Sequence, residues 1–357
     1  MKRVIFPASI AKYIPWGRLY NRKKRIFAIH TLPLAFFTSF FFALSGKMAP
    51  GGPKSISSRK GKAMARELKY DHVDVFTDKP LGGNQLAVFS APGKLTPTQM
   101  LAIAREINFS ETVFVASTKT EGVHARIRIF TVTEEIPFAG HPVLGTAFVI
   151  AMRSKKKLEQ ISLELGIGAI KVDIEHRGKK IHSLSMQQPL PVFGSALQNR
   201  EQAARALGVT VDDILGGGVV SNGLDFLIVE ATTLSAVQRA RCNAEDAIKV
   251  IKRHNVHAIY LFARLQGKGP NVHARLFTPM SFVIEDPATG SAAGALGGYL
   301  ARIFKFPMKL HLQIEQGIEI HRPSLISVDV NSERGTIDGV AVAGKVVSVG
   351  EGVIRFA

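Results

Sequence analysis

The sequence predicts a mixed α and β chain in which one structural unit occurs twice, and two observations lead to this fold class. A strand, a turn and the glycine-led start of a helix rich in small residues occur at 123–148 and again, roughly 150 residues later, at 272–296. Short apolar strands also alternate with helices too irregularly for a doubly wound parallel sheet. A chain of 357 residues, 46% of them hydrophobic, can bury a full core and form two domains.

Hydrophobic periodicity and turn residues predict the elements in order. Met100, Ile103, Ala104 and Ile107 are spaced to share one face of a helix, and glycines divide residues 161–186 into a meander of short strands. The expected elements are strands at 73–76 and 86–89, a helix at 96–107, strands at 112–115 and 123–130, a helix at 142–152, the meander at 161–186, a helix near 200–207, strands around 226–229 and 257–262, and a helix at 290–303.

Each copy of the repeat brings a polar residue to a helix start, His141 after Gly140 and Ser291 after Gly290. The first N–H groups of a helix lack partners within the helix, and the macrodipole adds about half a positive charge there. Pro142 suits a first helical position because it has no N–H to leave unpaired. Two such starts facing one cleft would hold a carboxylate or a developing enolate.

Glu111 is a candidate general acid/base. It lies between the amphipathic helix expected at 96–107 and the apolar strand expected at 112–115. Apolar neighbours such as Phe114 would raise the pKa of its carboxyl group, which proton transfer near neutral pH requires.

Five ordered segments give the chain a resemblance to a known family. They read VDVFTDKPLGGNQLAVF, REINFSETVFV, EEIPFAGHPVLGTA, EDPATGSAAGALGGYL and EQGIEIHRPSL. Together they resemble the PhzF-type isomerases of phenazine biosynthesis, within the diaminopimelate-epimerase-like superfamily, from about residue 69 to the end of the chain. Any one segment alone would be weak evidence, whereas five in the right order are strong evidence.

The resemblance implies an α+β fold of two pseudo-symmetric diaminopimelate-epimerase-like domains, each a curled mixed sheet around a central helix, with the active site in the cleft between them. The expected domains are residues 67–185, to which a C-terminal strand at about 345–357 returns, and residues 186–344. It further implies a homodimer. Membership of a phenazine pathway does not follow from it.

The resemblance also implies the roles of the site residues. Glu111 would carry protons between carbons of a small carboxylic-acid substrate, assisted by His141 and Asp286. No cofactor or metal is needed for such chemistry. The expected substrate-binding residues are Asn84, Gly140, Gly290 and Ser291.

One departure and one absence qualify the resemblance. The family usually has Gly-Asn-Pro where this chain has Gly83, Asn84 and Gln85, so we expect a less rigid loop. Diaminopimelate epimerases and proline racemases use two cysteines as opposed bases, one at each helix start. The single cysteine of this chain, Cys242, lies outside every motif, which excludes a two-thiol racemase and a disulfide framework.

Each candidate residue also has a purely structural interpretation. Glu111 can be a solvated carboxylate, His141 a hydrogen-bonded histidine, and Ser291 a residue that satisfies local backbone at a helix start. Asp286 can be an N-cap with Pro287 at the first helical position. Two rival functions stay open: a racemase or epimerase with Glu111 and Asp286 as opposed bases, and a binding protein without turnover.

The charge of the chain does not indicate nucleic-acid binding. The net charge is +18, but thirteen Lys or Arg and no Asp or Glu fall in residues 1–63, which leaves +5 for the rest. The remainder has no zinc spacing, basic-aromatic RNA motif or Walker loop.

Residues 1–66 form a basic and hydrophobic leader with a linker. The uncharged, Phe-rich run at 26–44 follows the basic cluster at 22–25, a pattern that fits a signal peptide or a membrane anchor. The third interpretation is translation from Met64, with the preceding residues a spurious extension. The protein is then cytoplasmic; otherwise it is exported or anchored through residues 26–44.

Overall fold

The computed structural model describes residues 66–267, 271–281, 283–305 and 308–356. The expected leader lies outside these residues except for Arg66, which begins the first strand. No helix of the described segments is long and apolar enough to cross a membrane.

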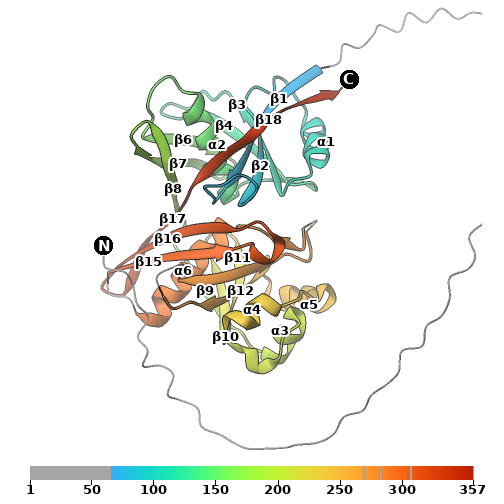
Figure 1. The fold of residues 1–357 in the computed structure, drawn as a ribbon, viewed down its shortest axis with the longest axis vertical. Coiled ribbons are helices and arrows are strands. Elements are labelled where there is room, and N and C mark those ends of the chain that lie inside the picture. Colours follow the sequence, from blue (N-terminus) through green and yellow to red (C-terminus); the bar gives the residue numbers. More distant parts are fainter. Residues whose placement is uncertain (1–65, 268–270, 282, 306–307, 357) are drawn as a thin grey trace, which may run out of the picture. The chain divides into compact units, whose positions relative to one another are not determined.

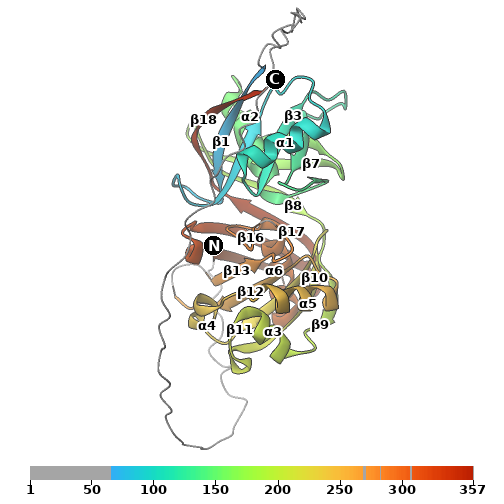
Figure 2. The same ribbon diagram turned by 90° about the vertical axis from the view of Figure 1, so that its right-hand side faces the viewer.

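The described chain forms two halves, each a set of strands around one helix (Figures 1 and 2). The first half contains β1 (Arg66–Val75), β2 (Asn84–Phe89), α1 (Pro97–Ile107), β3 (Glu111–Ala116), β4 (Ala125–Phe130), β5 (Glu135–Ile136), α2 (Gly140–Arg153), β6 (Gln160–Leu165), β7 (Gly168–Arg177) and β8 (Lys180–Gln188). The second half contains β9 (Val192–Ala196), α3 (Arg200–Leu207), η2 (Val211–Asp213), β10 (Ile214–Ser221), β11 (Asp225–Ala231), α4 (Leu234–Arg239), α5 (Ala244–His254), β12 (Ala258–Arg264), β13 (Val272–Phe277), β14 (Glu285–Asp286), α6 (Gly290–Phe304), β15 (Lys309–Gln316), η3 (Ile318–Ile320), β16 (Ser324–Glu333) and β17 (Thr336–Gly344).

The strand order repeats between the halves. In the first half the order is β18-β1-β2-β3-β4-β6-β7-β8, where β18 (Val346–Phe356) comes from the end of the chain. In the second it is β9-β10-β11-β12-β13-β15-β16-β17, with the same parallel pairs at the equivalent places. The short strands β5 and β14 pair with β4 and β13. The α+β class and the internal repeat are therefore confirmed.

Two crossings join the halves. Strand β18 runs back beside β1, antiparallel to it, as Figure 1 shows in red and blue. Strands β8 and β17 also pair antiparallel, so the described strands form one continuous hydrogen-bonded system.

A helix lies at the centre of each half. Helix α2 contacts β1, β2, β3, β6, β7 and β8, and α6 contacts β10, β11, β15, β16 and β17. Both helices are apolar around most of their circumference because strands cover them on several sides. Gly294 permits one close approach on α6: a Cβ there would lie 2.0 Å from Oε1 of Gln188.

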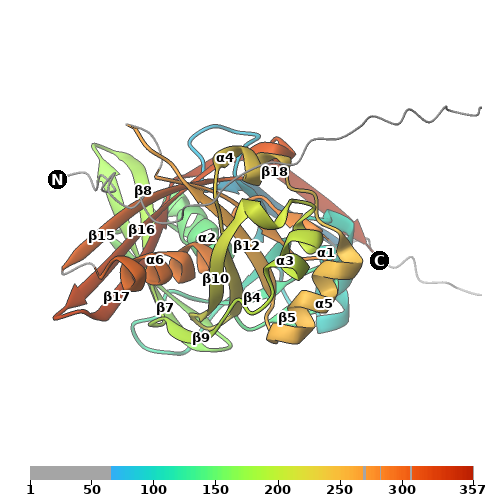
Figure 3. The same cartoon turned by 90° about the horizontal axis from the view of Figure 1, so that it is seen from below.

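The remaining helices cover outer faces of the sheets. Helices α3, α4 and α5 pack over β10, β11 and β12 in a second apolar cluster. Figure 3 shows α3 beside α5 in this layer. Helix α1 covers β3 and β4 in the first half, and its N-cap residue, Thr96, forms a capping box with Gln99.

The predicted helices and strands are all present; one detail of the prediction was wrong, and one structural alternative does not hold. Helix α2 begins at Gly140, so Pro142 is the third helical residue and not the first. A proline is still tolerated there because the first-turn amides have no intrahelical acceptor. Asp286 lies on β14 and does not cap α6, whose N-cap is Thr289.

Candidate active site

A cavity of about 310 Å³ lies between the halves, and both central helices begin at its wall. A Cβ added to Gly140 would lie 3.7 Å from the backbone nitrogen of Ser291 and 3.8 Å from Cα of Gly290, so the two helix starts face each other closely. Neither N-cap residue, Ala139 or Thr289, forms a side-chain capping bond. The first amides of both helices are thus left for a ligand.

Glu111 and His141 lie together at this cavity. Glu111 begins β3, and its Oε2 is 3.3 Å from Nε2 of His141, in an alignment that does not make a hydrogen bond. Burial, and then the nearby charge of Asp286, raise the pKa of Glu111 to about 8. Burial lowers the pKa of His141 to about 3, so this histidine is neutral at pH 7. The close contact is therefore not a permanent ion pair.

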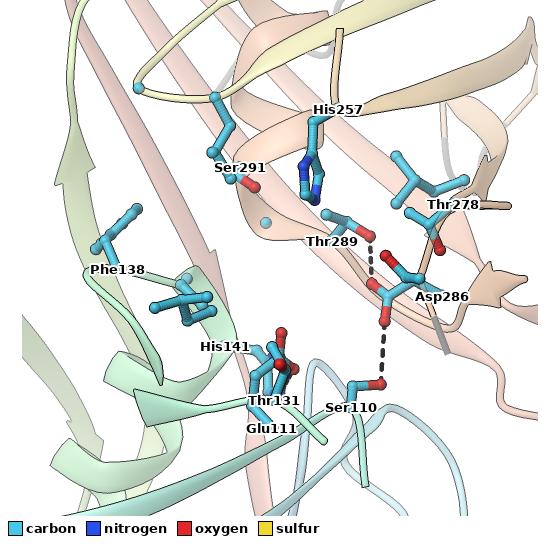
Figure 4. A pocket seen from close by; sticks show the side chains of 18 of the residues that line it. Ser110, Glu111, Thr131, Phe138, His141, His257, Thr278, Asp286, Thr289 and Ser291 are labelled. Carbon is cyan, nitrogen blue, oxygen red and sulfur yellow. Dashed lines mark hydrogen bonds and ion pairs between the residues drawn. The ribbon is translucent and has the colours of Figure 1, made fainter. Parts of the chain in front are cut away.

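Asp286 lies beside Glu111 and is surrounded by donors. Its Oδ1 accepts from Nδ2 of Asn84 at 3.0 Å. Figure 4 shows the two other bonds: Oδ1 accepts from the hydroxyl of Ser110 at 3.4 Å, and Oδ2 accepts from the hydroxyl of Thr289. Burial raises the pKa of Asp286 to about 6, although these donors partly offset the effect. Glu111 and Asp286 are thus neighbouring carboxyl groups, and the protonation of one affects the protonation of the other.

The internal repeat relates this wall of the cavity to an opposite wall, which has no such pair of carboxyl groups. Strand register places Glu111 opposite Leu86 in the first half and Ala258 opposite Phe226 in the second. By the same comparison, Asp286 pairs with Leu276 in the second half, and at the equivalent place in the first half Ile136 pairs with Ile129. Apolar Ala258 and Ile136 therefore occupy the positions that correspond to the two carboxylates.

The second wall carries His257 instead. By strand register it corresponds to Ser110, and its imidazole points into the cavity (Figure 4). Its ring lies edge-on to Phe226, with ring centres 6.4 Å apart. Burial lowers the pKa of His257, and the charge of Glu134 partly offsets this shift. This neutral ring offers both a donor and an acceptor to a ligand.

The cavity lining is mostly apolar and has no lysine or arginine among the described residues. Phe109, Phe138, Phe226 and Leu276 contribute much of its wall. Because no cationic side chain is present, a bound carboxylate would depend on backbone amides and helix dipoles. The described residues also contain no group of three His, Cys, Asp or Glu that could hold a metal ion.

Six of the seven residues selected from the sequence line this cavity: Gly140, His141, Gly290, Ser291, Glu111 and Asp286. Asn84 is the exception. It is buried, does not line the cavity, and uses its amide on Asp286 and on the carbonyl of Ala288, each at 3.0 Å. It therefore holds a carboxylate of the site, and its contact with a substrate stays a prediction.

The sequence prediction missed Ser110, Thr289 and His257. Ser110 precedes Glu111 and Thr289 precedes Gly290, so proximity in the sequence was a usable signal for both. No local signal existed for His257, because only the pairing of distant strands brings it to the cavity.

Comparison with known proteins gives consistent results. The family model described as "Phenazine biosynthesis-like protein" matches residues 73–352. The chain is 36% identical over 285 residues to a trans-2,3-dihydro-3-hydroxyanthranilate isomerase of Pseudomonas chlororaphis, covering 80% of this chain and 98% of that protein. It is 34% identical over 290 residues to an uncharacterized isomerase of Pasteurella multocida, covering 81% of this chain and 94% of the relative.

Solved structures are similar as well. A Bacillus anthracis phenazine biosynthesis protein of the PhzF family has a TM-score of 0.74 at 28% identity, over 81% of this chain and 99% of its own. A hydroxyproline epimerase from Agrobacterium vitis has a TM-score of 0.58 at 11% identity, over 81% of this chain and 93% of its own, and shares the fold alone.

Proposed function

The chain belongs to the phenazine biosynthesis-like family of isomerases, and we propose that it moves a proton between two carbons of a small carboxylic acid by general acid/base catalysis that needs no cofactor. The observation that carries this proposal is the position of Glu111, whose side chain is only 17% exposed, at the same cavity as two facing, uncapped helix starts. Ordinary solvated carboxylates are too weakly basic for this role near pH 7.

The substrate carboxylate would bind between the amides at Gly140 and His141 and those at Gly290 and Ser291. Amides and dipoles fixed in advance stabilise negative charge as it develops, a contribution worth about 3 kcal/mol for one well-placed donor in known enzymes. The neutral His141 beside Glu111 would orient the substrate or assist a second proton movement.

Glu111 would act first as base and then as acid. Its carboxylate takes a proton from a carbon made acidic by conjugation, leaving the electron pair delocalised toward the substrate carboxylate. The same carboxyl group then returns the proton to another carbon, so that a double bond moves and the net charge is unchanged. Asp286 would favour return of the proton, because its negative charge opposes a second one on Glu111.

The site supports double-bond migration over racemisation. Inversion of a stereocentre needs a base on each face of one carbon, whereas both carboxylates here belong to the same wall and the equivalent positions are Ala258 and Ile136. The residues immediately before the two helices are Ala139 and Thr289, which offer no thiol base. We therefore propose proton removal and return on one face of the substrate.

Relatives named trans-2,3-dihydro-3-hydroxyanthranilate isomerase act, by that name, on trans-2,3-dihydro-3-hydroxyanthranilate. We propose this cyclic acid as the first probe. One carboxylate on a small ring is compatible with a cavity that combines amide donors with aromatic walls and lacks cationic side chains. The homodimer implied by the family stays a prediction, which light scattering of the purified protein would test.

The test is proton NMR of the probe acid with enzyme in D2O. We expect the native protein to isomerise the acid and to introduce deuterium at the receiving carbon. Glu111→Gln should slow both processes at least 1,000-fold, because the amide cannot accept the proton, while the affinity for the acid changes less than about threefold. Unchanged exchange in Glu111→Gln would contradict the role of Glu111. Inversion of a stereocentre without double-bond migration would favour the racemase, and acid binding without exchange in the native protein would favour a binding protein.

A further inference from the structure

The segment at residues 315–325 is one of the five motifs in the sequence, yet none of its residues lines the cavity. It leaves β15, passes through η3 and enters β16 in the second half. Its arginine, Arg322, crosses to the first half and contacts the turn between β1 and β2. This turn leads directly into Asn84, which binds Asp286.

Arg322 holds the turn through three acceptors. Its Nε donates to the carbonyl of Gly83 at 3.0 Å, and its Nη2 donates to the carbonyl of Gly82 at 2.5 Å and to Oδ1 of Asp74 at 2.6 Å. Asp74 is fully buried, and its other oxygen accepts from the backbone N–H of Leu81 at 2.7 Å. A guanidinium is suited to this arrangement because its donors form a rigid planar fork.

Although the sequence predicted a less rigid loop here, contacts and backbone geometry constrain the turn. The N–H of Gly83 donates to the carbonyl of Pro323, next to Arg322, at 3.0 Å. Gly83 has a φ of 65°, and a Cβ there would lie 2.3 Å from the carbonyl oxygen of Val75. The following residue is Asn84, whose amide donates to Oδ1 of Asp286 and to the carbonyl of Ala288. A continuous set of contacts thus leads from Arg322 to a carboxylate of the cavity.

We propose that Arg322 is a positioning residue for the carboxylate pair: it fixes the turn at Gly82 and Gly83 so that Asn84, in the first half, donates to Asp286 in the second. The inference rests on the proposed function, because it assigns Arg322 an effect on the acid/base pair. Arg322 touches no substrate in this account and acts only through Asn84.

The contact has a consequence for protonation. Asn84 is one of the donors that favour the charged form of Asp286 against burial, so loss of its bond raises the pKa of Asp286. Ionisation of the Glu111–Asp286 pair would then require a higher pH. The charged and polar groups that face Asp286 come from both halves: Asn84 on β2, Ser110 before β3, Glu111 on β3, Tyr260 on β12, Thr289 before α6, and Gln316 on β15, which donates to the carbonyl of Asp286 at 2.8 Å. Those that face Arg322 are Asp74 and His72 on β1.

The test compares two arginines that pair with buried aspartates on the same strand. Arg153, the last residue of α2, binds Asp71 of β1 at 2.7 Å and does not line the cavity around Glu111. Isomerisation of the probe acid is followed from pH 5 to 10 for Arg322→Met and for the control Arg153→Met. We expect Arg322→Met to lower kcat at least tenfold, to change KM less than threefold, and to move the acidic limb of the rate profile upward by at least half a pH unit. Arg153→Met should leave the profile in place.

Two further variants separate positioning from general stability. Arg322→Lys keeps the positive charge beside Asp74 but loses the planar fork of donors. We therefore expect Arg322→Lys to show most of the upward shift in the acidic limb predicted for Arg322→Met. This variant keeps the inference testable if Arg322→Met does not fold. Asn84→Ala should reproduce that shift, and adding Arg322→Lys to it should change the limb no further.

An unmoved acidic limb in Arg322→Lys, or additive shifts in the double variant, would overturn the inference. Absence of any isomerisation by the native protein would instead overturn the proposed function, so the two failures are distinguishable.

Discussion

Glu111 shows what a single residue contributes and what it costs. The apolar segment around it predicted a raised pKa, and burial does raise it. The second cause, the charge of Asp286, was not predictable because the two residues are 175 positions apart and meet only through folding. In the proposed mechanism, such a desolvated carboxyl group serves catalysis at the expense of stability.

The cost can be measured through the pH dependence of unfolding. The pKa of Glu111 is about 8 when folded against an ordinary 4.5, so the folded state keeps a proton that the unfolded state releases, and stability falls as pH rises from about 4.5 to 8. Glu111→Gln removes this dependence. We expect its advantage in unfolding free energy over the native protein to grow to the order of 4 kcal/mol by pH 9. Urea unfolding at pH 5, 7 and 9 measures this.

The matched control is Glu121→Gln, which changes an exposed glutamate. It should follow the native protein at every pH. A constant difference between Glu111→Gln and the native protein across the same range would contradict the burial argument.

At the scale of elements, the two helix starts were predictable from the sequence because each copy of the repeat carries its own glycine and polar residue. The sequence did not show that the α2 amides begin two residues earlier than Pro142 suggested. It also did not show which wall of the cavity carries the carboxylates. That depends on the strand register, which places Ile136 of the first half at the position equivalent to Asp286 of the second.

Filling the space between the helix starts should weaken substrate binding. In Gly140→Ala the added Cβ would lie 3.7 Å from the backbone nitrogen of Ser291, where the substrate carboxylate is expected, and it would meet only the flexible end of Met186 at 3.1 Å. We expect affinity for the probe acid to fall at least tenfold with a small change in melting temperature. Calorimetric titration measures the affinity.

Gly216→Ala, on β10, is the matched control because its Cβ would meet nothing within 4 Å. Equal affinities of Gly140→Ala and the native protein for the acid would place the carboxylate site elsewhere.

A buried histidine, His273, lies at the junction of β13 and β15 between two carboxylates. His273 contacts Glu315 through Nδ1 at 2.7 Å and Glu319 through Nε2 at 2.8 Å. Burial opposes its charge, but the two carboxylates outweigh burial and raise the pKa of His273 to about 9. Its stabilising effect is thus complete below about pH 6.5 and is lost as pH rises through 9.

We therefore expect His273→Gln to lower the free energy of unfolding by about 3 kcal/mol at pH 6 and by much less at pH 10. Chemical unfolding at the two pH values measures the difference. His311→Gln is the control, because His311 pairs with Asp329 at the exposed surface and should change stability little at either pH. A loss in His273→Gln that is equal at both pH values would contradict the charged state of His273.

At the scale of the whole molecule, repetition in the sequence predicted two similar units, and the family resemblance implied that their central helices meet at a shared cleft. The continuous pairing through β8 and β17 was not predictable, because those strands carry no complementary motif and their pairing depends on the complete fold. The division at residues 185 and 186, and all three interpretations of the leader, stay predictions.

The two halves together make the site. Glu111 and His141 come from one half, Asp286 and Ser291 come from the other, and Arg322 crosses between them. A mechanism based on this arrangement requires the substrate to contact both halves at once.

A crystal structure of Glu111→Gln with the probe acid bound tests the central claim most directly. The account predicts the carboxylate of the acid within hydrogen-bond distance of backbone N–H groups from both helix starts, at Gly140–His141 and at Gly290–Ser291, with the side chain of residue 111 against a ring carbon. A carboxylate bound at the mouth near His257, or held by one helix start alone with residue 111 out of reach of the ring, would contradict it.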